Sequence, residues 1–232
     1  MNKNIFVFVA CDTTNLHKVK KIINETKTKK LKIGYKFGLE FFYSKNGRSF
    51  LSKINKKHKI FLDLKLNDIP NTCVSAINAL KDIKNIKYLT VHVNGGDEML
   101  RSIKKSIKKI NKNIKILGVT VLTSLKNVSL KKIGHTKSIN NLVIHQAKLA
   151  KVSGLDGIVC SANEAKLVKK ICKNMEIITP GIRLPGDKLN DQKRINSPKE
   201  AFKNGATAIV IGRSITKGSI KNNLQRLIKS LS

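Results

Sequence analysis

The ten residues Asp63-Leu-Lys-Leu-Asn-Asp-Ile-Pro-Asn-Thr72 place three charges at the end of an otherwise apolar run, Ile60–Leu66. On a strand, side chains two residues apart point to the same face, so Asp63 and Lys65 share one, with their Cα atoms about 6.5 Å apart. Where that face looks into a folded core, charges are costly to bury unless they pair. The three charges at Asp63, Lys65 and Asp68 therefore favour a reaction site over a solvated surface.

The rest of the chain repeats short apolar segments separated by helix-like stretches. Strands that alternate with helices form a parallel sheet, and eight such units in 232 residues fit a single closed α/β barrel, the (β/α)8 TIM barrel. An open, doubly wound sheet is the alternative that this pattern leaves. The predicted strands, rich in β-branched and aromatic residues, are Ile5–Ala10, Lys32–Gly38, Lys59–Leu64, Tyr88–Val93, Ile114–Leu122, Gly157–Cys160, Glu176–Thr179 and Ala208–Ile211.

Apolar residues at helical spacing, with lysines opposite, predict the helices between the strands. The clearest are Glu98–Ile110, Ser138–Ala150, Ala162–Cys172 and a helix with Pro198 at its first position. Serines typical of N-caps stand at 138, 161 and 197. No segment is typical of a domain linker, so residues 1–232 are predicted to form one barrel domain.

Composition indicates a globular chain, with 41% hydrophobic residues, and no apolar run approaches the roughly 18 residues that span a membrane. The apolar run Ile5–Ala10 before Cys11 resembles a lipoprotein signal, but it is shorter than the roughly 7–15 apolar residues in the core of a secretory signal peptide, and we expect a strand there. The four cysteines are scattered without a CxxC pair, which predicts reduced thiols of a cytoplasmic protein rather than a metal or disulfide framework.

The net charge of +33 on its own suggests a nucleic-acid-binding protein. However, the lysines are spread along the whole chain, and only 5% of residues are aromatic, which leaves few platforms for base stacking. We therefore interpret the charge as a solvated lysine surface, with weak, salt-sensitive adhesion to nucleic acid as a side effect and no specific nucleic-acid or membrane partner.

In such barrels the chemistry lies at the C-terminal ends of the strands, and polar residues follow seven of the eight predicted strands. A long aperiodic segment, Gly181–Asn196, follows the seventh strand, and a loop of this length is often a lid. Three of only six arginines, Arg183, Arg194 and Arg213, fall in the last two loops, where such barrels commonly bind phosphate. The polar residues at the strand ends are Asp12, Lys36, Asp63, Lys65, Asp68, His92, Thr123, Ser124, Arg183, Gly212 and Arg213.

Several of these residues have simpler interpretations. Asp12 is also typical of a helix cap, and Lys36 of one more surface lysine, although its even spacing from Gly34 and Gly38 favours an inward face. The pair Thr123-Ser124 is typical of a turn as well. We leave His92 out of the catalytic set, because such a histidine is more often a core or capping residue.

Together these residues resemble the orotidine 5′-phosphate decarboxylase family of bacterial type. The central motif D-x-K-x-x-D-I-x-x-T matches Asp63–Thr72, and the other matches follow in the family's order from Asp12 to Thr216. Departures are Asn67 where many relatives carry His, Cys11 in the first strand, and a looser segment around Lys36. The further matching segments are Gly118–Ser124, Val159–Ala162, Thr179–Arg183, Asp191–Arg194 and Val210–Thr216.

The resemblance implies cofactor-free, metal-free decarboxylation of orotidine 5′-monophosphate to UMP by a homodimer with shared sites. It implies that Lys65 donates a proton to C6 of the pyrimidine, that Asp63 lies beside the leaving carboxylate, and that Asp68 enters the other subunit's site. Lys36 would orient the acidic residues and a ribose hydroxyl. The implied substrate contacts are Asp12, Lys36 and Thr72 to the ribose, Thr123 and Ser124 to the base, and Gln192, Gly212 and Arg213 to the phosphate, with Arg183 nearby.

Two other functions remain open. A sister enzyme of the same superfamily, a hexulose-phosphate synthase or keto-gulonate-phosphate decarboxylase, shares D-x-K-x-x-D but uses Mg²⁺ to stabilise an enediolate. The tail Ile69–Thr72, Arg183 and the Asp191-Gln192 pair favour the pyrimidine enzyme. The second alternative, a nucleic-acid-binding protein, is suggested by charge alone.

Overall fold

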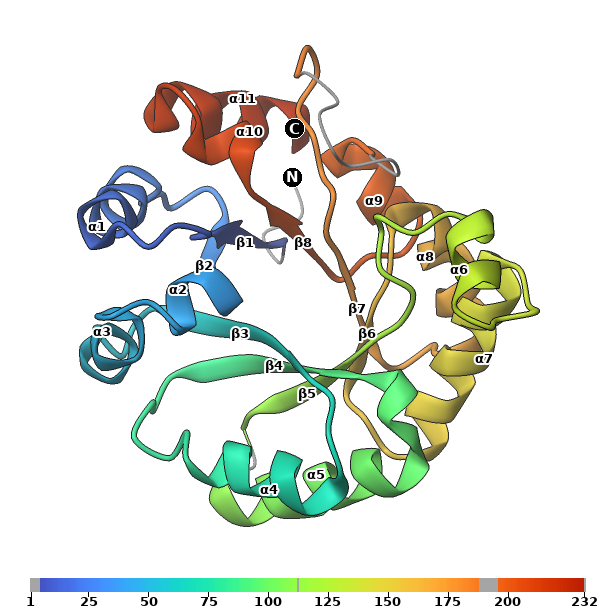
Figure 1. Ribbon diagram of the computed structural model, residues 1–232. Helices are drawn as coiled ribbons and strands as arrows, with labels where there is room; N and C mark the ends of the chain where they lie inside the picture. Colours follow the sequence, from blue (N-terminus) through green and yellow to red (C-terminus); the bar gives the residue numbers. More distant parts are fainter. Residues whose placement is uncertain (1–4, 112, 188–195, 232) are drawn as a thin grey trace.

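Eight parallel strands close into a barrel in the computed structural model of the chain, which describes residues 5–111, 113–187 and 196–231 (Figure 1). Each strand pairs with the next in sequence, and β8 pairs with β1 from Phe6↔Ala208 to Val9↔Ile211. This closure confirms the TIM barrel and excludes the open sheet. The strands are β1 Phe6–Ala10, β2 Lys32–Gly38, β3 Lys59–Leu66, β4 Ile86–His92, β5 Lys115–Val119, β6 Gly157–Val159, β7 Glu176–Thr179 and β8 Ala208–Ile211.

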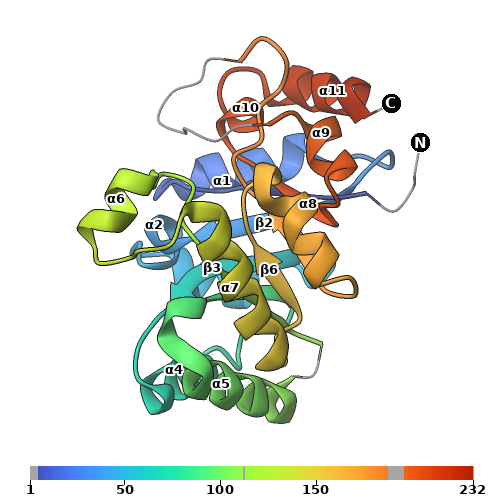
Figure 2. The same cartoon turned by 90° about the vertical axis from the view of Figure 1, so that its right-hand side faces the viewer.

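Helices cover the outside of the barrel, as Figures 1 and 2 show from two sides. The predicted caps at 138 and 197 are confirmed, because Ser138 accepts a hydrogen bond from the Asn141 amide and Ser197 from the Glu200 amide. Ser161 is the N-cap residue of α8 through its backbone, whose amide donates to the Glu164 carboxylate. None of the described helices is both long and apolar enough to cross a membrane. The helices are α1 Leu16–Glu25, α2 Leu39–Phe42, α3 Gly47–Lys53, α4 Pro70–Asn78, the 3₁₀ turn Val93–Gly95, α5 Gly96–Ile110, α6 Asn127–Lys132, α7 Ile139–Val152, α8 Ala162–Ile171, α9 Pro198–Lys203, α10 Arg213–Thr216 and α11 Ile220–Leu231.

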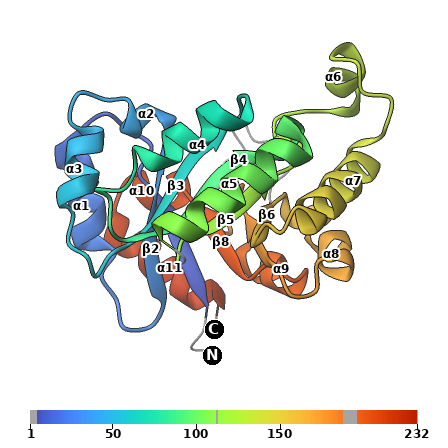
Figure 3. The same cartoon turned by 90° about the horizontal axis from the view of Figure 1, so that it is seen from below.

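The strand boundaries differ from the prediction mainly at β5, which ends at Val119 and not at Leu122. Both the amide and the hydroxyl of Thr120 donate to the carbonyl of Val159, at 3.2 and 3.0 Å. Since β6 itself ends at Val159, the chain beyond Thr120 has no further strand to pair with. It leaves the barrel toward α6, which projects beyond the other helices on the side where the strands end (Figure 3).

Two apolar cores hold the barrel together, one between sheet and helices and one inside the ring of strands. Inside the ring, Phe8 packs edge-on against Phe61, with ring centroids 5.4 Å apart, and also contacts Tyr88. Gly34 makes room for this layer, because a Cβ there would lie 2.5 Å from Phe8. The barrel interior is therefore filled from below by aromatic side chains, which leaves open space at the C-terminal ends of the strands.

Candidate active site

Four charged side chains of alternating sign form a continuous chain across the mouth of the barrel. The ammonium of Lys36 lies 2.9 Å from Asp12 and 3.3 Å from Asp63. The Nζ of Lys65 lies 2.9 Å from Asp63 Oδ2, the same carboxylate oxygen that Lys36 contacts. The structure thus brings the predicted pair Asp63 and Lys65 together with two further predicted residues, Lys36 on β2 and Asp12 just beyond β1.

Strand alternation places these charges directly above the aromatic core. Asp63 is two residues beyond the inward-facing Phe61, and Lys36 is two beyond Gly34. Gly38 continues the same face, where a Cβ would lie 3.1 Å from Asp12 Oδ1 and 3.3 Å from Lys36 Nζ. The inward face predicted for Lys36 is confirmed, and only 8% of this residue is exposed.

Lys65 has a left-handed backbone conformation, with φ of 50°, which no other described residue except glycines shares. The conformation coincides with a shift in the pairing of β3 with β4, where Leu62 pairs with Leu89 but Leu66 pairs with Val91. Such a conformation in a residue with a Cβ costs of order 1–3 kcal/mol and is concentrated at functional sites. The shift leaves the Lys65 side chain facing Asp63 at the barrel mouth.

Thr90 fixes this arrangement and was not among the residues expected from the sequence. The Lys65 amide, displaced from the regular strand ladder, donates to Thr90 Oγ1 at 2.9 Å, and the Thr90 hydroxyl donates to Asp63 Oδ1 at 3.1 Å. Thr90 is fully buried. The available signal was its place on β4, two residues beyond Tyr88 on the inward face, which a threonine in an apolar strand does not make conspicuous.

The electrostatic environment of Asp63 and Lys36 favours the charged form of both buried side chains. Burial is the largest influence on Asp63 and opposes ionisation, but the ammonium groups of Lys36 and Lys65 outweigh it and lower the pKa of this carboxyl. Burial likewise opposes the charge on Lys36, yet Asp63 and Asp12 together raise its pKa. Both groups therefore remain charged at neutral pH.

A cavity of about 460 Å³ opens beside this charged chain, within the usual range of about 300–1,000 Å³ for small-molecule sites. Its charged wall contains Asp12, Lys36, Asp63 and Lys65, and Thr123 also faces it. The opposite wall comes from the segments after β7 and β8. The residues there are Pro180, Gly181, Arg183, Gly212, Arg213 and Thr216.

The described residues at the two ends of the segment after β7 contact each other. Ile182 forms an isolated parallel bridge with Asn196, and the Arg183 amide donates to the Asn196 carbonyl at 3.0 Å. The predicted lid, 181–196, lies in part outside the described residues, as do Gln192 and Arg194, and all three stay predictions. Arg183 and Arg213 nevertheless place two guanidinium groups along the cavity.

Three expected site residues do not line this cavity in their own chain. Asp68, Thr72 and Ser124 are exposed, and Asp68 uses Oδ1 to accept a hydrogen bond from the Ile69 amide at 2.7 Å. All three lie in segments that follow strand ends, which places them at the rim of the barrel mouth.

The structure also decides between alternatives that the sequence left open. The cap of α1 is Asn15, whose side chain accepts from the Lys18 amide at 3.0 Å, so Asp12 does not cap this helix. Lys36 is buried and not a surface lysine. Half-buried His92 lies close enough to Lys65 and Asp63 to interact with their charges, and its burial lowers its pKa, which favours a neutral ring beside the cluster.

We expect Lys36→Met to lower the free energy of unfolding by about 3 kcal/mol, because Lys36 is buried and its charge has a larger effect on buried Asp63 than that of the more exposed Lys65. The Asp63 pKa is lowered in the folded state, so this contribution is present at neutral pH and is lost as pH falls through the folded-state value. Urea unfolding at neutral pH and near pH 3 measures both effects.

The matched control is Lys59→Met, which removes an exposed lysine from the opposite end of the neighbouring strand. We expect it to change the free energy of unfolding by less than about 0.5 kcal/mol. Equal effects of the two substitutions at neutral pH would show that the buried ion pairs of Lys36 do not stabilise the barrel.

Comparison with known proteins agrees with this geometry. The chain is 41% identical to orotidine 5′-phosphate decarboxylase of Fusobacterium nucleatum, over 97% of this chain and 94% of the relative. It is 44% identical to that of the Wolbachia of Brugia malayi, over 97% and 99%. The crystal structure of orotidine 5′-phosphate decarboxylase from Lactobacillus acidophilus superimposes with a TM-score of 0.83 at 34% identity, covering 97% of this chain and 98% of that one.

The match to a family model extends over almost the whole barrel, from residue 6 to residue 223. It therefore includes every strand and all the described residues of the charged chain and of the cavity. The family match agrees with the closed eight-stranded barrel and with the charges of alternating sign at its mouth. The chain therefore belongs to the orotidine 5′-phosphate decarboxylase / HUMPS family.

Proposed function

We propose that this protein decarboxylates orotidine 5′-monophosphate to UMP and CO₂, the last step of de novo pyrimidine synthesis. The observation that carries the proposal is the chain Asp12–Lys36–Asp63–Lys65, which ends on an ammonium at a cavity with arginines on its opposite wall. The identity of 41–44% to orotidine 5′-phosphate decarboxylases supports the choice of substrate.

The reaction places specific demands on such a site. Breaking the bond between C6 and the carboxylate leaves the electron pair on C6, in the plane of the pyrimidine ring and without a conjugated electron sink. A fixed ammonium beside C6 stabilises that charge as it develops and then transfers a proton to form the C6–H bond. The resulting amine regains its proton from water before the next turnover.

Lys65 is suited to this role, because Asp63 holds its ammonium in place while the side chain stays accessible from the cavity. Asp63 holds its ammonium at 2.9 Å, while about a third of the side chain, 31%, remains exposed toward the mouth. Asp63 is itself held by Lys36 and Thr90, so Lys65 is positioned before substrate arrives. In our proposal Asp63 lies beside the substrate carboxylate, whose departure relieves the repulsion between two like charges.

The arginine wall supplies binding energy away from the reacting carbon. We assign the substrate phosphate to Arg213, the Gly212 backbone and Gln192, with Arg183 nearby, and the base to Thr123 and Ser124. Arg183 and Arg213 line the cavity on the side away from Lys65, and a forked guanidinium suits a phosphate. Binding energy gained at the phosphate can be used at C6 to hold the substrate in a reactive position.

We further propose that two copies of the chain share their active sites. The rim of the mouth carries exposed apolar side chains that a single chain leaves uncovered: Leu39 at 46%, Tyr43 at 78% and Ile69 at 67% exposed. Asp68 and Thr72 flank Ile69 and miss the cavity of their own chain. A two-fold contact through this rim would bring Asp68 of the partner subunit toward Lys65, and Thr72 of the partner subunit toward the ribose.

The cytoplasm is the compartment that we propose, because nucleotide precursors are made there. All four cysteines, Cys11, Cys73, Cys160 and Cys172, are buried free thiols, as expected of a protein in a reducing compartment.

The Mg²⁺-dependent sister activity is the second candidate, because the family description covers both enzymes. The relatives named orotidine 5′-phosphate decarboxylase favour the first. Loss of the orotate absorbance on mixing the purified protein with orotidine 5′-monophosphate and EDTA distinguishes them. We expect full turnover with EDTA; no turnover in any buffer sinks the proposal, and turnover abolished by EDTA and restored by Mg²⁺ indicates a metal-dependent enzyme.

A further inference from the structure

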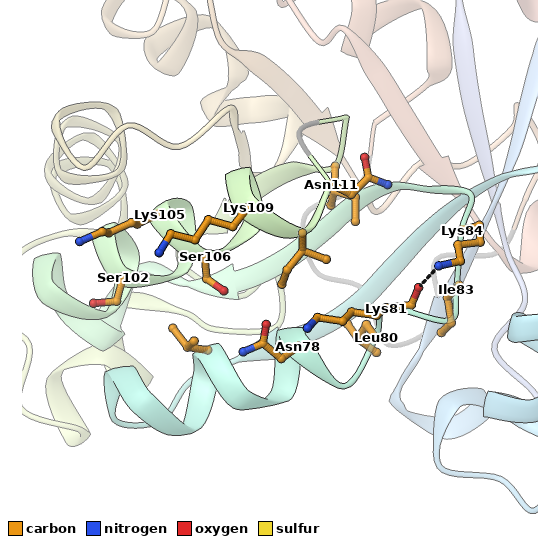
Figure 4. A pocket seen from close by; sticks show the side chains of 13 residues that line it. Asn78, Leu80, Lys81, Ile83, Lys84, Ser102, Lys105, Ser106, Lys109 and Asn111 are labelled. Atoms are coloured by element: carbon orange, nitrogen blue, oxygen red, sulfur yellow. Dashed lines mark hydrogen bonds between the residues drawn. The ribbon is translucent and has the colours of Figure 1, made fainter.

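A second cavity, larger than the active site, lies on the outside of the barrel between α4 and α5. Its volume is about 770 Å³, and it is lined by α4, the turn that follows it, α5 and the residues after α5. Figure 4 shows Lys105, Ser106 and Lys109 along one wall and Asn78 and Lys81 along the facing wall. We call this cavity the α4–α5 groove; it shares no lining residue with the active-site cavity.

The α4–α5 groove is strongly basic, and its positive charge is not neutralised from within. Four of its lining residues, Lys81, Lys84, Lys105 and Lys109, are lysines, and none is acidic. The ammonium groups of Lys81, Lys105 and Lys109 have no hydrogen-bond or ion-pair partner among the described residues, whereas Lys84 donates to the Lys81 carbonyl at 2.7 Å.

Nearby acidic residues are directed elsewhere. Asp82, adjacent to Lys81, is held by both guanidinium nitrogens of Arg48, at 2.8 and 3.0 Å. α4 contains no acidic residue, and those of α5, Asp97 and Glu98, lie in its first turn. The lysines of the groove therefore repel one another without an internal counter-charge, which an anion with several charges would supply.

The other lining residues restrict the kind of anion. Hydroxyl and amide groups, including Ser102, Ser106 and Asn78, lie between the lysines and can donate hydrogen bonds to phosphoryl oxygens. No aromatic side chain lines the groove, so stacked bases of a single-stranded nucleic acid find no platform.

From these features we propose that the α4–α5 groove binds a polyphosphate chain, as a ligand site separate from the active site. The chain is the shared chemistry of nucleoside triphosphates and of inorganic polyphosphate. Lys81 on one wall and Lys105 and Lys109 on the other contact successive phosphoryl groups. The proposal does not depend on the proposed decarboxylase activity, because the two cavities are separate.

Calorimetry with tripolyphosphate, at fixed ionic strength and without Mg²⁺, tests the proposal. We expect the variant Lys81→Gln/Lys105→Gln/Lys109→Gln to bind tripolyphosphate at least about tenfold more weakly than the native chain. The control is Lys166→Gln/Lys170→Gln, which removes two exposed lysines on α8 with the same spacing as Lys105 and Lys109. We expect the affinity of this control for tripolyphosphate to stay within about twofold of the native value. All three substituted positions are at the surface, and a thermal melt verifies folding.

A second measurement locates the ligand. Acetylation of surface lysines, followed by mass spectrometry, should show tripolyphosphate protecting Lys105 and Lys109 while Lys166 and Lys170 react as before. UTP binding that is tighter than tripolyphosphate binding, and lost in the same variant, identifies a nucleoside triphosphate as the ligand; weaker UTP binding identifies inorganic polyphosphate. Absence of tripolyphosphate binding, equal losses in both variants, or protection only at the active site overturns the proposal.

Discussion

We expect Lys65→Ala to lower kcat/KM for orotidine 5′-monophosphate by at least about 10⁴-fold, because in our proposal this one substitution removes two contributions to catalysis. A positioned proton donor contributes about 10²–10⁴-fold, and a preorganised charge at the site of developing negative charge contributes about 10²–10³-fold. In our proposal both come from the same ammonium, that of Lys65, which lies 2.9 Å from Asp63. Steady-state decarboxylation, followed by loss of the orotate absorbance, measures the effect.

The alternative explanation, that the variant loses activity by unfolding, is testable at the same residue. After truncation Asp63 keeps Lys36 at 3.3 Å and the Thr90 hydroxyl at 3.1 Å, so we expect only a small loss of stability. Lys65→Gly additionally removes the cost of a Cβ at φ of 50°. We expect both variants to melt within a few degrees of the native chain, to bind UMP and to be inactive. More than about one hundredth of native activity in folded Lys65→Ala protein contradicts the role of Lys65.

The parts of this site that follow regular strand geometry were predictable from the sequence. Alternation on a strand aligns Asp63 with Phe61, and Lys36 with Gly34, so once the barrel is accepted both charges must point inward. The barrel itself follows from counting alternating segments. The end of β5 was predicted three residues too late, because apolar content does not reveal that β6 offers no partner beyond Val159.

What the sequence could not give depends on departures from regular geometry. Lys65 was expected to share a face with Asp63 through plain alternation, whereas the actual contact involves a left-handed residue and a shift in strand pairing. The Thr90 hydroxyl accepts a hydrogen bond from the Lys65 amide, which this shift removes from the regular strand ladder. The shift has no sequence signal, and the inward-facing place of Thr90 on β4 does not reveal its role, because both depend on how two strands align in space.

The proposed shared site leads to the second large effect, a gain of activity from two inactive proteins. Lys65→Ala and Asp68→Ala chains, each inactive alone, should regain about a quarter of native activity when mixed in equal amounts. Random exchange makes about half of the dimers hybrids, and in each hybrid one of the two sites combines an intact Lys65 with an intact Asp68. Activity assayed before and after subunit exchange, with exchange verified by native mass spectrometry, measures the gain.

A matched mixture within the same cluster makes this result specific. Lys36 and Lys65 contact the same Asp63 in one chain, at 3.3 and 2.9 Å, so Lys36→Ala and Lys65→Ala chains cannot form an intact site in any hybrid. We expect that mixture to remain inactive after exchange. If the Asp68→Ala mixture also stays inactive despite demonstrated hybrids, Asp68 does not serve a neighbouring site, and its exposed position at the rim requires another explanation. If instead both mixtures recover, exchange restores folding rather than an active site, and the assignment of Lys36, Asp63 and Lys65 to a single catalytic unit is wrong.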